Sequence, residues 1–394
     1  MSQREVLLVG AARTAIGSFG GSLKDVPLTG LATTVVRAAL ERSGIDAAEV
    51  GQVVLGNVIP TEPNDAYLSR VAALDAGIPN PVSAYNVNRL CGSGLQAILC
   101  AAQAILLGET DVAVGGGAES MSRSPYLLPA ARWGARMGTA EMVDYMASAL
   151  HDPWHKIHMG ITAENVAERH GITRAMQDEL ALESQRRAAR AIAEGRFREQ
   201  IVPVEVPTRK GPVLFDTDEH VRADVTAEQL AKMNPVFKKD GRVTAGNASG
   251  INDGAAAVVL MEARRASALG LRPLARLVSW GHAGVEPAYM GIGPVPATRL
   301  ALQRAGLSVD DLDVIESNEA FAAQACAVTR ELGLDPAKVN PNGSGISLGH
   351  PLGATGAINT VKAIHELLRT GERYALVTMC IGGGQGIAAV FERV

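Results

Sequence analysis

The sequence has few aromatic residues and few cysteines for its length of 394 residues. Aromatic residues make up 4% of the chain, so aliphatic side chains and 42 glycines must fill and shape the core. This composition favours tightly packed α/β layers over an aromatic-rich sandwich. The cysteines are too few for a disulfide framework and fit a reducing compartment. They are Cys91, Cys100, Cys326 and Cys380.

The chain also lacks a strong charge bias. Its 37 basic and 41 acidic residues give a net charge of −4 without a basic run, so we expect no nucleic-acid partner. No Cys/His cluster has metal-ligand spacing, so no metal is expected. Glycine or charge interrupts the apolar stretches short of a membrane span, and a strand pattern begins at Glu5. We therefore expect a cytoplasmic protein without a signal peptide or membrane segment.

One stretch of the sequence presents a cysteine at the start of an apolar helix. In V-N-R-L-C-G-S-G-L-Q-A-I-L a short extended run ends at Cys91, and apolar residues then recur at helical spacing as far as Gly108. A helix N-terminus lowers a thiol's pKa and favours the nucleophilic thiolate. Gly92 and Gly94 would let a substrate approach the backbone closely. From this stretch alone, a reactive thiol and a small buried core residue are equally consistent.

Alternating helix and strand patterns predict an α/β fold with a mostly parallel sheet covered on both faces. The expected strands are 5–10, 50–58, 111–117, 252–262 and 273–280, and the expected helices are 28–42, 69–77, 93–107, 161–170, 174–194 and 299–305. The alternation stops between residues 121 and 250, where Trp, Met, His and Pro become frequent. A long insertion of this kind is more often functional than idle.

The second half of the chain repeats the order of features in the first. Residues 41–57 and 303–318 share an arginine, a glycine, an acidic stretch and a final asparagine. Cys91 and His350 each precede an apolar helix opened by glycines, which leads to a strand and three glycines. A pseudo-twofold pairing of two such halves would place both residues in one cleft. The predicted parts are an N-terminal half (1–120 with 251–272), an inserted loop domain (121–250) and a C-terminal half (273–394).

Two further polar positions occur where strands end. Asn318 lies in E-S-N-E-A-F-A, and Cys380 directly precedes three glycines in M-C-I-G-G-G. Glycines there allow backbone N–H groups to face a ligand, as in an oxyanion hole. Cys100 and Cys326 lie within apolar runs and are predicted to be core residues.

These motifs together resemble the thiolase family over the full length of the chain. The resemblance rests on C-G-S-G, A-G-N-A-S-G, N-E-A-F, G-H-P-L-G-A-T-G and C-I-G-G-G, in that order. It implies a thiolase fold, in which two duplicated βαβαβαββ halves form a five-layered α-β-α-β-α core with an inserted α+β loop domain. Within the family the sequence is most similar to the biosynthetic β-ketothiolases (acetyl-CoA acetyltransferases). H-D-P-W-H-K-I-H-M-G resembles β-ketothiolases of polyhydroxyalkanoate-making bacteria, which also accept ketoacyl chains longer than four carbons.

The resemblance implies a reversible Claisen condensation by a ping-pong mechanism. Two acetyl-CoA, or acetyl-CoA and a short acyl-CoA, would give 3-ketoacyl-CoA and free CoA through an acylated Cys91. His350 would take the proton of Cys91, and the N–H groups of Cys91 and Gly382 would bind the oxyanion. Cys380 would deprotonate the second acetyl-CoA, and His350 with a water held by Asn318 would stabilise the enolate.

The resemblance also implies that the insertion binds coenzyme A. The implied contacts are Ser249 and His158 along the pantetheine arm, Arg222 and Phe237 near the nucleotide end, and Met159, Met290 and Phe321 around the acyl group. From the residues alone, the Met and Phe side chains could equally be ordinary core and Arg222 a solvated charge. Coenzyme A thioesters are then substrates, and no tightly bound cofactor is expected. A homotetramer is implied, with R-W-G-A-R-M-G (132–138) as its tetramerisation loop, although any exposed basic loop could look the same.

Two other functions stay open. A ketoacyl synthase that loads from a carrier protein would complete its site with His or Asn partners, where this chain has Cys380. A non-catalytic lipid-binding member of the superfamily would have lost a catalytic residue, and none is lost here. A dinucleotide site, suggested by G-G-G-A-E-S, is excluded because no G-x-G-x-x-G follows the first strand.

Overall fold

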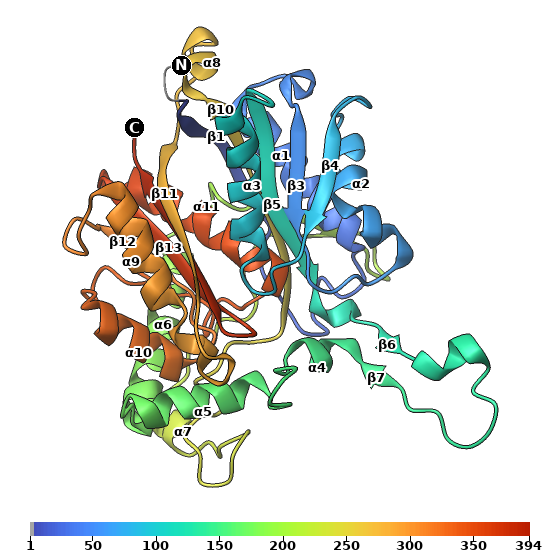
Figure 1. Cartoon of the computed structure of the whole chain (residues 1–394), viewed down its shortest axis with the longest axis vertical. Helices are drawn as coiled ribbons and strands as arrows, with labels where there is room; N and C mark the ends of the chain where they lie inside the picture. Colours follow the sequence, from blue (N-terminus) through green and yellow to red (C-terminus); the bar gives the residue numbers. More distant parts are fainter. Residues whose placement is uncertain (1–3) are drawn as a thin grey trace.

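The computed structural model describes residues 4–394, and its centre is a mixed β-sheet in the order β12-β13-β14-β11-β1-β10-β5-β3-β4, with β2 beside β10 (Figure 1). The strands are β1 (Val6–Arg13), β2 (Gly17–Ser18), β3 (Gln52–Gly56), β4 (Ser83–Val87), β5 (Val112–Ser120), β10 (Asn252–Glu262), β11 (Ala275–Gly284), β12 (Val314–Ser317), β13 (Tyr374–Ile381) and β14 (Gln385–Glu392). The helices packed on it are α1 (Leu28–Ser43), α2 (Leu68–Asp75), α3 (Ser93–Leu107), α9 (Pro294–Ala305), α10 (Ala322–Leu332) and α11 (Leu352–Thr370).

The strand order repeats between the two halves of the chain. The N-terminal strands lie in the order β4-β3-β5-β10-β1, and the C-terminal strands in the order β12-β13-β14-β11. At the position equivalent to β4, Val339 forms a parallel bridge with Ile315 of β12. The first strands of the halves, β1 and β11, meet where Leu7 pairs with Arg276. The duplication inferred from the sequence is therefore present in the topology.

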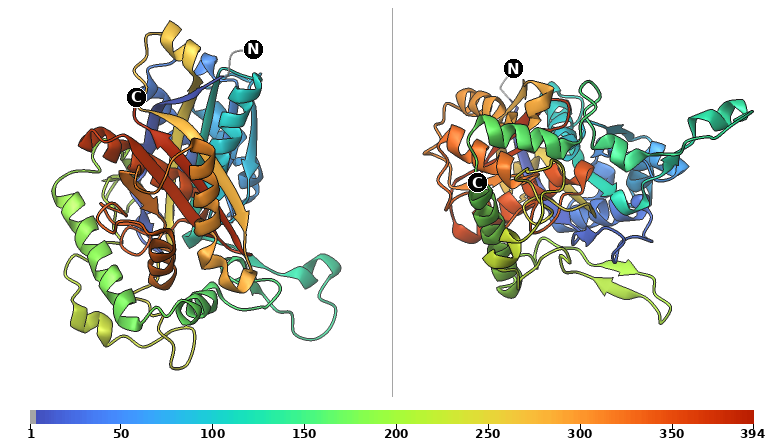
Figure 2. Two further views of the ribbon diagram at one scale, coloured as in Figure 1. Left: turned by 60° about the vertical axis from the view of Figure 1, so that its left-hand side comes forward. Right: turned by 90° about the horizontal axis from the view of Figure 1, so that it is seen from below.

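The helices form three layers around the two halves of the sheet. Helices α1 and α2 pack on one face of the N-terminal strands, and α9 and α10 on the far face of the C-terminal strands. Helices α3 and α11 lie between the halves and share one core with strands of both, as the turned views show (Figure 2). The result is the expected α-β-α-β-α sandwich, with the two duplicated central helices at its centre.

The strand directions differ from the mostly parallel sheet that the sequence predicts. β3 runs parallel to β4 and β5, and β12 to β13. The pairs β1·β10, β5·β10, β1·β11, β11·β14 and β13·β14 are antiparallel. The prediction was wrong because each half ends on a strand that no crossover helix precedes. In the C-terminal half, Gly383 and Gly384, both at φ 80°, turn the chain straight from β13 into β14.

The insertion packs on the C-terminal half and carries a projecting arm. Helices α5 (Met159–Arg169) and α6 (Arg174–Ala193) contact α10, with α4 (Tyr145–Ala149) and α7 (Ala227–Ala231) beside them. A buried ion pair between Arg13 of β1 and Asp218, at 2.8 Å, fastens the insertion to the N-terminal half. The short hairpin of β8 (Val204–Val206) and β9 (Val213–Phe215) lies at the surface. The arm carries β6 (Tyr126–Leu127) and β7 (Val143–Asp144) and extends away from the body (Figure 1).

Most predicted elements agree with the structure, with two informative differences. β5 continues to Ser120, so that Glu119 belongs to the strand. The stretch Leu90–Leu107, mean hydropathy 1.8, is long and apolar enough by composition to cross a membrane, contrary to the expectation that every apolar stretch is too short. It contains α3, and 61% of the stretch is buried inside the protein. This helix is apolar because it lies at the centre of the core.

Candidate active site

An apolar cavity of about 360 Å³ lies where the N-termini of the two central helices meet the insertion. Ten of the twelve residues predicted for the site line it: Cys91, His158, Met159, Phe237, Ser249, Met290, Phe321, His350, Cys380 and Gly382. Asn318 lies directly behind His350. Arg222 is exposed and does not line the cavity, so its role at the nucleotide end of coenzyme A stays a prediction.

Cys91 is presented on a tight turn before α3. Leu90 has φ 47°, a left-handed conformation that a branched side chain adopts only under constraint. The Ser93 hydroxyl supplies that constraint, because its oxygen accepts from the Arg89 N–H (2.8 Å) while it donates to the Leu90 carbonyl (2.6 Å). This clip, which the sequence analysis did not identify, holds the nucleophile at the end of the cavity.

The thiol of Cys91 is not acidified as the helix position predicts. Burial raises its pKa to about 11, although the N–H groups of Gly382 and of Cys91 itself point at the sulfur and lower it. Desolvation disfavours the thiolate by more than the two N–H groups stabilise it. The expected low pKa is therefore wrong, and the nucleophile rests as a thiol that needs a base.

His350 has the protonation state of such a base. Its ring is 4% exposed, and burial lowers its pKa to about 4, so the imidazole is neutral near pH 7. Its Nδ1 lies 2.7 Å from the Thr355 hydroxyl oxygen, whose own proton is donated to the Pro351 carbonyl (2.9 Å). The Thr355 oxygen therefore accepts from Nδ1–H, which leaves the lone pair of His350 on Nε2.

Asn318 and Cys380 complete the polar groups around His350. The Asn318 amide nitrogen lies 3.4 Å from both ring nitrogens, and its side-chain oxygen is buried without a partner within residues 4–394. An amide with a free acceptor in this place can hold a water molecule. Cys380 is fully buried at the end of β13, and burial together with the neighbouring Cys91 raises its pKa far above the ordinary range.

Glu119 is a buried carboxyl that sequence reasoning missed. It accepts from the N–H groups of Val58 (3.1 Å), Ile59 (3.0 Å) and Gly353 (2.6 Å), the last in the first turn of α11. Burial raises its pKa to about 8 in spite of these donors. It ties the end of β5 to the helix that follows His350. The signal in the sequence was a carboxylate two residues after the last glycine of G-G-G-A-E-S.

Two glycines allow the central helices to meet at backbone distance. A Cβ at Gly94 of α3 would lie 2.8 Å from the Ala357 nitrogen, and one at Gly356 of α11 would lie 2.4 Å from the Leu95 nitrogen. Side chains at either position would separate the helices. The separation between Cys91 and His350 thus depends on this contact.

The insertion supplies an aromatic wall to the cavity. The His158 ring stacks on Phe237 at 4.6 Å between centroids, and Phe237 meets Phe321 edge-on at 6.1 Å. The two cysteines predicted to be core are only partly buried. Cys100 receives a hydrogen bond from Gln96 (3.3 Å), and Cys326 lines a separate groove.

Comparison with known sequences assigns the family. A model of the thiolase N-terminal domain matches residues 6–264, and one of the thiolase C-terminal domain matches residues 271–393. The chain belongs to the thiolase family. This thiolase is 69% identical over 392 residues to beta-ketothiolase BktB of Cupriavidus necator, which covers 99% of the chain and 100% of the relative. It is 54% identical to an acetyl-CoA acetyltransferase of Pseudomonas aeruginosa, with 99% and 100% covered.

Solved structures agree with this assignment and with the predicted thiolase fold. The acetyl-CoA acetyltransferase of Bacillus anthracis superimposes on this thiolase with a TM-score of 0.97 at 49% identity, covering 100% of this chain and 99% of that one. Human mitochondrial 3-ketoacyl-CoA thiolase in complex with CoA gives a TM-score of 0.96 at 44% identity, covering 99% and 98%.

Replacing Thr355 by valine is expected to lower kcat roughly ten- to a hundredfold with little change in KM. The substitution removes the acceptor for His350 Nδ1–H, so the ring loses its fixed tautomer while the cavity keeps its shape. Steady-state thiolysis rates measure this split. Thr355→Ser keeps the acceptor and should restore kcat, and a Thr355→Val enzyme within twofold of wild type would contradict the assignment.

In the wild type, kcat/KM should fall as pH drops through about 4, because protonated His350 cannot accept a proton.

Proposed function

We propose that this thiolase catalyses the reversible condensation of acetyl-CoA with acetyl-CoA or a short acyl-CoA, giving 3-ketoacyl-CoA and free CoA. The observation that carries the proposal is the meeting of Cys91, His350, Cys380 and Gly382 in one apolar cavity. A second thiol beside the nucleophile has no use in a simple thioester hydrolase. It is needed where a C–C bond forms after the acyl group has been loaded.

In the first step, the Cys91 thiol attacks the thioester carbonyl. His350 Nε2 accepts the thiol proton and returns it to the departing CoA thiolate, which balances the transfer. The N–H groups of Cys91 and Gly382, which already point toward the sulfur, can bind the oxyanion as it forms. His350 is neutral near pH 7 because its pKa is about 4, so the lone pair of Nε2 is available for this proton.

In the second step, the Cys380 proton passes to His350 Nε2, and the resulting thiolate takes a proton from the methyl carbon of the incoming acetyl-CoA. The His350 Nε2–H and a water on the Asn318 amide stabilise the enolate oxygen, and the enolate carbon attacks the acyl-Cys91 carbonyl. The C–S bond to Cys91 breaks as the C–C bond forms, and the released Cys91 thiolate takes the proton from His350. Thiolysis follows the same path in reverse, with Cys380 as the acid.

The acyl end of the cavity supports acceptance of chains longer than four carbons. Met159 and Met290 are flexible side chains that rearrange at low cost, and Phe321 lies beside them. We expect 3-ketovaleryl-CoA and 3-ketohexanoyl-CoA to be cleaved at rates within about tenfold of acetoacetyl-CoA, since each methylene changes selectivity by roughly 1–3 kcal/mol. Steady-state thiolysis of the three substrates tests this. A rate confined to acetoacetyl-CoA would contradict broad chain length, and activity with acyl-carrier protein but not CoA thioesters would contradict the function.

The projecting arm and an open sheet edge support a homotetramer built as a dimer of dimers. β4 ends the sheet with Tyr85 exposed, which suits pairing with a second copy. The arm exposes Trp133 (82%) and Met137 (97%) within the predicted tetramerisation loop. Large apolar side chains this exposed are typical of contact surfaces.

Replacing Trp133 and Met137 together by aspartate is expected to halve the mass of the assembly in solution. The charges would oppose burial of the arm, whereas the β4 edge is untouched. Light scattering after size exclusion measures the mass. Leu214→Asp, at an apolar residue of β9 that is also exposed (65%), is the matched control. An unchanged mass for the double variant would contradict the role of the arm. We further propose that the protein acts in the cytoplasm, a reducing compartment that suits the free cysteines of its site.

A further inference from the structure

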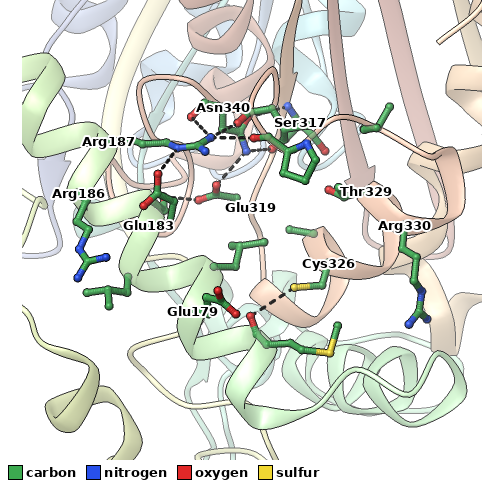
Figure 3. A pocket seen from close by; sticks show the side chains of 18 of the residues that line it. Glu179, Glu183, Arg186, Arg187, Ser317, Glu319, Cys326, Thr329, Arg330 and Asn340 are labelled. Carbon is green, nitrogen blue, oxygen red and sulfur yellow. Dashed lines mark hydrogen bonds and ion pairs between the residues drawn. The ribbon is translucent and has the colours of Figure 1, made fainter. Parts of the chain in front are cut away.

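A second cavity, of about 770 Å³, lies between α6 and α10 (Figure 3). It shares no lining residue with the catalytic cavity. Its floor contains Ser317 and Glu319, which flank Asn318 in the chain, so the two cavities lie on opposite sides of one short segment. Neither the catalytic steps nor the proposed binding of coenzyme A uses this groove.

The floor of the groove carries one polar group with free bonding capacity. The Ser317 side chain is 1% exposed, and its hydroxyl has no hydrogen-bond partner within residues 4–394. The carboxyl group of nearby Glu319 already has hydrogen-bond partners, because it accepts from the Ser184 hydroxyl (2.6 Å) and the Asn340 amide (2.9 Å). A buried hydroxyl without a partner is costly, and a ligand group that bonds it would recover that cost.

Two of the three arginines that line the groove have hydrogen-bond partners within the protein. Arg187 donates to Glu183 (Figure 3), at 2.7 Å, and to the Val339 carbonyl, at 2.5 Å. Arg330 donates to the carbonyl of His170. The buried Glu319 carboxyl, whose pKa burial raises, faces the floor. A carboxylate bound at Ser317 would be repelled by the ionised form of this carboxyl, whereas the guanidinium of Arg186, which also lines the groove, is exposed to solvent and points away from Ser317 (Figure 3).

The walls of the groove are mostly apolar. The apolar lining includes Leu180 of α6, Ala325 of α10, Leu334 and Val339. A volume of this size accommodates a small organic molecule. We propose that the groove is a second small-molecule site for a neutral amphiphile, whose chain packs against these walls and whose carbonyl or hydroxyl group bonds Ser317.

Titration calorimetry on the assembled enzyme saturated with CoA tests this site with hexanamide and with hexanoate as a probe of equal length. Saturation with CoA directs the probe away from the catalytic cavity. Hexanamide should bind saturably and hexanoate at least tenfold more weakly. Ser317→Ala should weaken hexanamide binding roughly tenfold, the value of one hydrogen bond, and should not lower the melting temperature, because the hydroxyl makes no hydrogen bond within residues 4–394.

A second variant separates the site from any effect of Ser317 on folding. Thr329 lies on the rim and is partly exposed, so Thr329→Trp fills the groove from outside and should abolish hexanamide binding. Absence of saturable hexanamide binding to the wild type would overturn the proposal. So would undiminished binding to the Thr329→Trp enzyme, equal binding to the Ser317→Ala enzyme, or equal affinity for hexanoate.

Discussion

Replacing Cys91 by serine is expected to lower kcat for acetoacetyl-CoA thiolysis by at least roughly a thousandfold. The hydroxyl fits the same turn, because the clip between Ser93 and Leu90 does not involve the substituted side chain. A hydroxyl is a far weaker acid than a thiol with a pKa of about 11, and neutral His350 with a pKa of about 4 is too weak a base to remove its proton. Acyl transfer from the resulting ester would also have to expel an alkoxide, which is a poorer leaving group than a thiolate.

Loss of acetoacetyl-CoA under steady-state conditions measures the effect of Cys91→Ser, and mass spectrometry after brief mixing detects the acyl-enzyme. The wild type should gain one acetyl group, whereas the variant should gain none. An unchanged melting temperature would show that the fold is intact. Retention of more than a few per cent of activity would mean that Cys91 is not the nucleophile.

Replacing Cys380 by serine is expected to lower the overall rate roughly a hundred- to a thousandfold in both directions while sparing the first half-reaction. Acyl transfer from acetyl-CoA to Cys91 needs Cys91 and His350 alone, but formation of the C–C bond needs a base at the position of Cys380. The acetylated enzyme should therefore accumulate when the variant is mixed with acetyl-CoA.

The separation of the two half-reactions makes this second test specific. Exchange of labelled CoA into acetyl-CoA should continue in the Cys380→Ser enzyme, and acetoacetyl-CoA synthesis should be lost. Cys100→Ser on α3 is the matched control, because Cys100 does not line the cavity. Loss of exchange in parallel with synthesis would assign Cys380 to the first step and contradict its role as the carbon base.

Local sequence patterns were sufficient to predict where Cys91, His350 and Cys380 lie relative to the strands and helices. Each lies beside glycines at the end of a strand or the start of a helix, and such turns are encoded by a few neighbouring residues. The duplication then brought Cys91 and His350 together. The helices α1, α3, α5 and α6 followed from apolar periodicity in the same way.

Predictions from the sequence missed, or gave wrongly, the features that depend on residues far apart in the chain. The thiol pKa of Cys91 depends on how completely other segments bury it, which the local helix position does not reveal. Glu119 receives the N–H of Gly353, 234 positions away, so its function exists only in the folded chain. The sheet directions were wrong because strand pairing is decided by the return path of the chain rather than by the pattern within a strand.

The glycine contact between α3 and α11 also has a consequence for how the enzyme reaches its active form. Cys91 and His350, which precede the two helices, lie 259 positions apart in the sequence, and each helix can form early from local contacts. Catalysis needs their docking, which closes a very long loop and comes late. During refolding, helical signal should therefore recover before turnover. The interval between the two measures how long the chain remains ordered but unable to catalyse.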